Sequence, residues 1–171
     1  MGEALVNRST GTDFGNMTFS GGLAATRDGN TNQDDAAAAR TIGSAATGYA
    51  GSAFGAGKAY SRFIIYGTNN AGYHDSGTGT IILTIYGKNG VPANSTDGTS
   101  LGTTSFANYA NASDGKNIAS TNLVTTYTHV WVAVTLPSAD VSRCAEFIIY
   151  EVTASAPPPR RRGPRFFRRS S

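Results

Sequence analysis

The acidic, amide and hydroxyl side chains of residues 28–34 (DGNTNQD) have the types and spacing that bind a hard cation. Their oxygens recur at alternate positions, as ligands do in calcium-binding loops. The segment is not an EF-hand, because Gln33 occupies the position that requires glycine and Ala39 the position that requires glutamate. Asp28, backbone carbonyls and a remote carboxylate could still hold a cation. The alternative is a tight Asp-Gly turn without a metal.

Three long polar loops are the second place where the sequence carries binding chemistry. They span residues 68–79, 88–102 and 108–122, and they combine Asn, Asp, Gly and Ser with a few aromatic residues. Aromatic faces can stack on sugar rings, while amide and imidazole groups hydrogen-bond hydroxyls. The predicted ligand-binding residues on or beside these loops are Asn69, Asn70, Tyr73, His74, Phe106 and Tyr109. The alternative is that the loops only cover the ends of a β-sandwich.

The C-terminal segment has a different chemistry from the rest of the chain. Residues 154–171 include three consecutive prolines at 157–159, which predict an extended spacer. The segment has no acidic residue, whereas the preceding residues carry a formal net charge of −3. We expect an anchoring peptide, in which Arg pairs with carboxylates and Phe fills pockets of a neighbouring subunit. Its anchoring residues are Arg160, Arg161, Arg162, Arg165, Phe166, Phe167, Arg168 and Arg169. The alternatives are a solvated tail or a DNA contact.

Motifs of catalysis are present only as fragments. Residues 98–102 (GTSLG) spell the pattern of a hydrolase nucleophile elbow, but a turn precedes them and a strand-like run follows, where the elbow needs a strand and then a helix. Gly57-Lys58 resembles the end of a phosphate-binding loop, yet Ser52 and Ala59 replace its first glycine and its magnesium-binding hydroxyl. We therefore expect no enzymatic activity.

Histidine and cysteine are too few for a zinc or disulfide framework. The chain has two histidines and one cysteine. His129 lies within a predicted strand and is expected to be packed or to face its edge. Cys144 precedes the last strand and is most simply a small buried residue.

The elements that must position these residues are strands. Four segments are rich in β-branched and aromatic residues and are bounded by turn formers: 60–66, 80–86, 127–134 and 145–152. Weaker strands are expected at 18–19, 103–106 and 118–124. Residues 34–40 could form one or two helical turns, with acids first and Arg40 last. Strands with turn-rich connections and no repeated helical segments predict an all-β fold, a sandwich or jelly roll.

The length and composition set the outer limits of this interpretation. A chain of 171 residues with 15% charged residues corresponds to one ordinary domain. Its apolar runs are only a few residues long, so no membrane span is expected, and the N-terminus lacks the features of a secretory signal. We expect an N-terminal segment at 1–19 that joins the sandwich, the sandwich itself at 20–153, and the Pro/Arg-rich tail at 154–171.

Several stretches together resemble the discoidin-like, galactose-binding-domain-like superfamily. They are residues 22–31 (GLAATRDGNT), 48–54 (GYAGSAF) and 61–67 (SRFIIYG), followed by 83–90 (LTIYGKNG), 96–102 (TDGTSLG) and 145–151 (AEFIIYE). The resemblance covers roughly residues 20–153. Arg27 stands where the superfamily has an aromatic residue before Asp-Gly. More narrowly, the chain resembles small virion proteins of tailed bacteriophages and phage-like particles.

This resemblance implies an eight-stranded jelly-roll sandwich that binds sugars through loops at one end. It also implies one structural calcium ion, held by a loop of the Asp-Gly-Asn-Thr type and a carboxylate of the final strand. The corresponding metal positions are Asp28, Asn30, Thr31 and Glu146.

The resulting prediction is a virion structural protein of a tail, fibre or head decoration. It would display a carbohydrate-binding module for attachment to a host-surface glycan, contact other virion proteins through its tail, and form a homo-oligomer. One alternative is a purely architectural capsid or tail subunit that binds only neighbouring proteins. Another is an Arg tail that contacts DNA, in which the acidic body would take no part.

Overall fold

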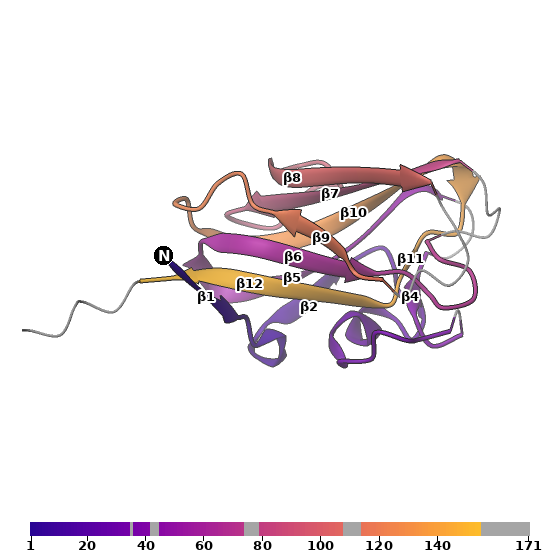
Figure 1. Cartoon of the computed structure of the whole chain (residues 1–171), viewed down its shortest axis with the longest axis horizontal. Coiled ribbons are helices and arrows are strands. Elements are labelled where there is room, and N and C mark those ends of the chain that lie inside the picture. The colour runs from indigo at the N-terminus through magenta and orange to yellow at the C-terminus, as the bar shows by residue number, and fades with distance from the viewer. Residues whose placement is uncertain (35, 42–44, 74–78, 108–113, 155–171) are drawn as a thin grey trace, which may run out of the picture.

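The computed structural model describes residues 1–34, 36–41, 45–73, 79–107 and 114–154. In this part of the chain, two antiparallel sheets lie face to face (Figure 1). One sheet has the order β2 (Thr12–Gly15), β5 (Ala45–Lys58), β10 (Tyr127–Asp140), β7 (Thr80–Lys88) and β8 (Thr99–Ala107). The other has the order β1 (Gly2–Leu5), β12 (Glu146–Thr153), β6 (Tyr60–Tyr66) and β9 (Lys116–Ala119). The expected all-β sandwich is therefore confirmed.

Shorter elements complete the described chain at one end of the sandwich and along its side. A small sheet has the order β11 (Arg143–Cys144), β4 (Ala39–Arg40) and β3 (Phe19–Ser20). Two 3₁₀ turns, η1 (Arg8–Thr10) and η2 (Leu23–Arg27), connect the first strands. None of the helices in the described residues is long and apolar enough to cross a membrane.

The core lies between the two large sheets and follows from the alternation of apolar residues along their central strands. In a strand, successive side chains point to opposite faces, so every second residue enters the core. All of these inward residues are fully buried. From the four-stranded sheet they are Phe63, Ile65, Phe147 and Ile149, and from the five-stranded sheet Ile81, Leu83, Ile85, Val130, Val132 and Val134.

The longest strand that the sequence did not predict is β5. Its residues are mainly Ala, Gly and Ser, which have little intrinsic preference for strands. It forms because β2 and β10 pair with its two edges. The small residues permit this close pairing: a Cβ on Gly51 would lie 2.4 Å from the Cβ of Trp131.

Of the one or two helical turns expected at residues 34–40, only a single turn forms, and the segment then becomes a strand. The N–H groups of Ala37 and Ala38 both donate to the carbonyl of Asp34, which makes a turn. Ala39 and Arg40 then form β4, where Ala39 pairs with Cys144 on one side and Ser20 on the other. Pairing with strands distant in sequence outweighs the weak helix preference of a short alanine run.

The outer face of the five-stranded sheet carries an aromatic cluster around the single tryptophan. Trp131 stacks on Tyr86 at 5.6 Å between ring centroids, and Phe14 meets it edge-on at 5.8 Å. Its indole N–H donates to the carbonyl of Ser95 at 2.7 Å, which fixes the loop between β7 and β8 over the sheet. His129 lies beside this cluster, where burial and nearby Lys88 lower its pKa. The prediction that His129 is a packed strand residue is confirmed.

Candidate functional site

The Asp28 loop and the last strand meet, as the resemblance implied. Gly29, which has a positive φ of 81°, donates its N–H to Glu146 Oε2 at 3.0 Å. Asp28 accepts hydrogen bonds from the backbone N–H of Asn30 at 2.8 Å and from Gln33 Nε2 at 2.6 Å. The turn therefore brings the carboxylates of Asp28 and Glu146 to the same part of the surface.

Glu146 is the buried member of this pair of carboxylates. Its exposed fraction is 4%, and burial raises its pKa to about 7. The Gly29 N–H and the charge of Arg8 oppose that rise, whereas the charge of Asp28 adds to it. Among the described residues, the Gly29 N–H is the donor to this carboxylate and it binds Oε2. The other oxygen, Oε1, accepts no hydrogen bond from them.

This donor set fits a hard cation only if backbone carbonyls complete it. The described residues contain no group of three or more His, Cys, Asp or Glu side chains able to hold a metal. The carboxylate of Asp28 in the turn and that of Glu146 in β12 nevertheless supply the oxygen ligands that calcium prefers. Asn30 uses its side-chain oxygen to accept from Asn32 N–H, and Thr31 is half-buried in the same loop. Calcium binding by Asp28, Asn30, Thr31 and Glu146 stays a prediction.

The predicted sugar residues near residue 70 lie at the end of the sandwich opposite the N-terminus (Figure 1). Asn70 is exposed and Asn69 is half-buried, with its backbone N–H donating to the carbonyl of Gln33 at 2.9 Å. Tyr73, however, is fully buried, and its hydroxyl donates to the carbonyl of Ile65 at 3.0 Å. The expectation that Tyr73 presents a ring face to a ligand is therefore wrong, because this ring completes the core.

The ring of Phe106 packs against other residues of the protein. Its half-buried ring meets Tyr73 edge-on at 5.2 Å, and Lys116 Nζ lies 4.7 Å from the ring centre. A role of Phe106 in ligand binding stays a prediction. His74 and Tyr109 lie outside the described residues, as do all eight anchoring residues of the tail at 160–169.

The structure reveals an exposed aromatic residue near these loops that was not among the predicted ligand-binding residues. Phe19, in β3, is 47% exposed, and the guanidinium of Arg40, its partner in β4, lies 4.6 Å from the ring centre. An exposed ring held by a cation is a suitable platform for a sugar or an apolar group. The only sequence signal was a weak strand at 18–19, since Phe19 and Arg40 become neighbours through pairing of distant segments.

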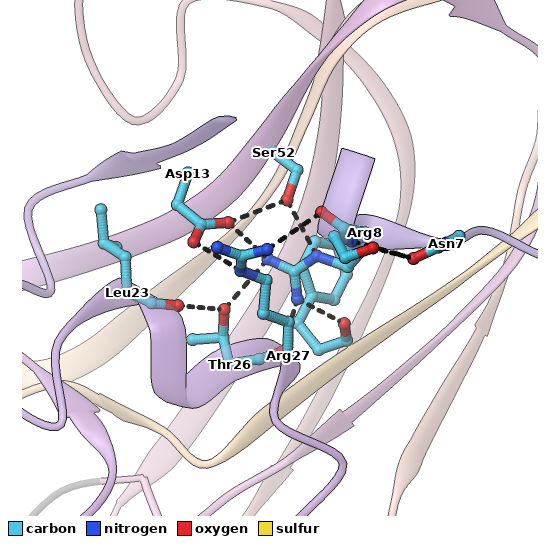
Figure 2. A network of polar contacts seen from close by, with 9 residues as sticks. Asn7, Arg8, Asp13, Leu23, Thr26, Arg27 and Ser52 are labelled. Carbon is cyan, nitrogen blue, oxygen red and sulfur yellow. Dashed lines mark hydrogen bonds and ion pairs between the residues drawn. The ribbon is translucent and has the colours of Figure 1, made fainter. Parts of the chain in front are cut away.

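A buried polar network joins the N-terminal segment to both large sheets (Figure 2). Arg8, which is 6% exposed, donates to Ser52 Oγ at 2.8 Å, to both oxygens of Thr26, and to the carbonyl of Phe147 at 2.7 Å. Burial lowers the pKa of Arg8, against the opposing charge of Asp13. The partners of Arg8 lie in β5, η2 and β12, so the network holds these elements together and has a structural role.

Asp13 is the acidic centre of the same network. Arg27 Nε lies 2.7 Å from one of its oxygens, and Arg8 Nη2 lies 3.6 Å from the other. Arg27 also donates to the carbonyl of Arg8 at 3.3 Å. The ion pair with Asp13 thus gives Arg27 a structural role directly before the Asp28 turn.

Comparison with known proteins shows the fold. No protein-family model and no curated protein sequence matches the chain. A fucolectin from striped bass (Morone saxatilis) serum is similar, with a TM-score of 0.65 and 15% identity over 86% of this chain. The present chain spans about half of that fucolectin, 49%.

Two further structures are similar over nearly their whole length. An F5/8 type C domain from Bacteroides fragilis has a TM-score of 0.61 and 16% identity, covering 87% of this chain and 96% of that chain. The family 32 carbohydrate-binding module of NanJ from C. perfringens, solved in complex with galactose, has a TM-score of 0.58 and 15% identity, covering 87% and 99%. The chain is thus an all-β protein with the galactose-binding-like β-sandwich fold of F5/8 type C and family 32 carbohydrate-binding domains.

Proposed function

We propose that this protein is a carbohydrate-binding module without catalytic activity of its own. The observation that carries the proposal is the shared sandwich, because the module solved with galactose covers 87% of this chain with a TM-score of 0.58. In a sandwich, the loops at one end can vary while the sheets hold them rigidly, which suits ligand binding.

The loop end supplies the chemistry that a sugar needs. The exposed ring of Phe19 offers an apolar face to sugar C–H groups, and stacking on Arg40 fixes its orientation. Asn70 is exposed on a loop at the same end, where its amide can both donate to and accept from hydroxyls. Together with the predicted His74 and Tyr109, these residues form the proposed site.

The predicted calcium ion would support this end of the sandwich. When bound, it would neutralise the carboxylates of Asp28 and Glu146 and fix the turn that joins η2 to β4. The turn also contacts the Asn69 loop, through the hydrogen bond from Asn69 N–H to the carbonyl of Gln33. A cation here would therefore stiffen two loops at once.

A glycan array probed with the full chain tests the proposal. We expect binding to a defined set of glycans and loss of most of that signal in Phe19→Ala. Val124→Ala is the matched control, because Val124 is an apolar residue, 81% exposed, in the β9–β10 loop, which lies near the start of β6 whereas Asn70 follows its end. Absence of binding to any glycan, or equal loss in both variants, would refute the site.

Display on a phage particle is a finer proposal that the fold does not address. None of the three similar structures described above is a virion protein. The support comes from the sequence resemblance and from the Arg/Phe tail, which suits attachment to a larger assembly. The architectural and DNA-contacting alternatives rest on the same tail.

A further inference from the structure

A groove lies beside the last strand, at the place where the first strand leaves it. β1 pairs with β12 from Leu5 opposite Tyr150 to Gly2 opposite Thr153. Val6 N–H then donates to the carbonyl of Ile149 at 2.9 Å, after which the chain turns away into η1. The departure opens a pocket of about 400 Å³, lined by residues 5–9, Arg27, Gly29 and residues 146–150.

The walls of this groove are mainly apolar, and several of their side chains are exposed to solvent or only half-buried. Leu5 is 64% exposed, and Ile148 and Tyr150 are half-buried. These three side chains share the outer face of the four-stranded sheet, because Leu5 pairs with Tyr150 and Ile148 lies two residues before it. On β6 the face continues with Ile64, opposite Ile148. An apolar guest of one or two large side chains matches a groove of this kind.

The same face already accommodates a guanidinium next to an aromatic ring. Arg62 Cζ lies 3.8 Å from the centre of the Tyr150 ring, and Arg62 Nε lies 3.2 Å from Glu3 Oε2. Glu146 lines the groove at its other end, together with Arg8 and Arg27, whose guanidinium groups pair with Asp13. A guest that alternates Arg with large apolar side chains therefore suits both the apolar walls and the acidic groups around them.

The C-terminal tail of this protein has that composition. Residues 154–171 contain six Arg, the adjacent pair Phe166-Phe167 and no acid. The other eight Lys and Arg residues and all 11 Asp and Glu residues precede the tail, so the body carries a formal charge of −3. Charge attraction thus favours contact between tail and body.

The direction of β12 and the length of the tail bear on which copy's groove the tail can reach. β12 runs along the groove from Glu146 to Tyr150 and continues away from it to Thr153. Three prolines at 157–159 predict an extended spacer after this strand, at about 3.1 Å per residue. The tail therefore starts beyond the groove of its own copy, and its 18 residues can span at most roughly 60 Å towards another copy.

We propose that the groove beside β12, at the point where β1 leaves it, binds the Phe166-Phe167 segment of a second copy of this chain. The contact is heterologous, with the groove of one copy meeting the tail of the next, so that it produces closed rings or open chains rather than twofold dimers. This assembly does not depend on the carbohydrate site.

Two full-length variants test the proposal in complementary ways. Phe166→Ser with Phe167→Ser removes the apolar guest and leaves the groove intact. Leu5→Arg places a positive charge at the rim of the groove and leaves the tail intact, and the exposure of Leu5 makes unfolding an unexpected outcome. Val124→Arg is the matched control, since it adds the same charge at an exposed apolar residue that does not line the groove.

The readout is mass by sedimentation or light scattering. We expect the wild type and Val124→Arg to form oligomers, and each of the two test variants alone to be monomeric. A mixture of the two test variants has one intact groove and one intact tail per pair, so it should yield 1:1 dimers and nothing larger. A monomeric wild type would overturn the proposal. This is the result expected if the tail binds its own copy or a different protein. So would oligomers that persist in either test variant, or a mixture without dimers.

Discussion

Replacing Arg8 by methionine should destabilise the protein far more than an ordinary surface substitution. The side chain is 6% exposed and donates to the side chain of Ser52, to the carbonyl of Phe147 and to both oxygens of Thr26. Methionine retains much of the volume but none of the donors, so these acceptors lose their partner in the interior. Asp13 would keep Arg27 as its remaining ion-pair partner.

The size of the effect can be estimated from the burial of the network. Removing one partner of a buried, hydrogen-bonded charge cluster costs about 3–5 kcal/mol. For a chain of this length, each kcal/mol lowers Tm by about 2–4 °C, so Arg8→Met should lower Tm by roughly 6–20 °C. The matched control is Arg62→Met, because Arg62 and its partner Glu3 have side-chain exposures of 28% and 43%. An exposed pair of this kind contributes about 0–1 kcal/mol.

The assay is urea unfolding of both variants, followed by circular dichroism and by the fluorescence of the single tryptophan. A double-mutant cycle with Asp13→Asn then measures the coupling between Arg8 and Asp13. If Arg8→Met loses no more free energy of unfolding than Arg62→Met, the buried network does not hold the N-terminal segment to the two sheets. A coupling energy of zero would remove Asp13 from that role.

Three further results are expected. Gly98→Val should cost about 1–3 kcal/mol and shift the tryptophan emission, because a Cβ there would lie 2.6 Å from Trp131 Cη2; an unchanged spectrum and stability would contradict this packing. With divalent cations chelated, protonated Glu146 should contribute to the free energy of unfolding. This contribution is complete below the ordinary pKa of 4.5 and is lost as pH rises through about 7, because the folded protein keeps the proton to a higher pH than the unfolded chain does. Glu146→Gln should flatten that part of the pH profile, and an identical profile would show that the carboxylate is not buried. Above pH about 7, calcium should raise Tm of the wild type but not of Glu146→Gln, and equal shifts in both would place any bound calcium elsewhere.

The sequence predicted those parts of the fold that local composition determines. The strands expected at 60–66, 80–86, 127–134 and 145–152 correspond to β6, β7, β10 and β12. They are rich in β-branched and aromatic residues, so their preference and their burial agree. β5 could not be found in this way, because its Gly-, Ala- and Ser-rich sequence becomes a strand only between two partners.

The candidate site was less accessible to sequence reasoning, because it depends on contacts between distant segments. Tyr73 looked like a loop aromatic, yet its loop folds inward and the ring is fully buried. Nothing in the sequence around Phe19 predicts an exposed ring beside a cation, because Arg40 reaches that ring only through the pairing of β3 with β4. The meeting of Asp28 and Glu146 could be anticipated only from the family resemblance, since 117 residues separate Gly29 from the carboxylate that it contacts.

The central claim is that this sandwich binds a glycan at the end formed by the β3–β4 pair and the loop after β6. Heteronuclear NMR of the full chain, titrated with a glycan that the array identifies, tests it most directly. The account predicts saturable shift changes at Phe19, Arg40 and Asn70, with little change at Val124 at the opposite end. Shift changes confined to that opposite end or to the β1–β12 groove, or none at saturating glycan, would contradict it.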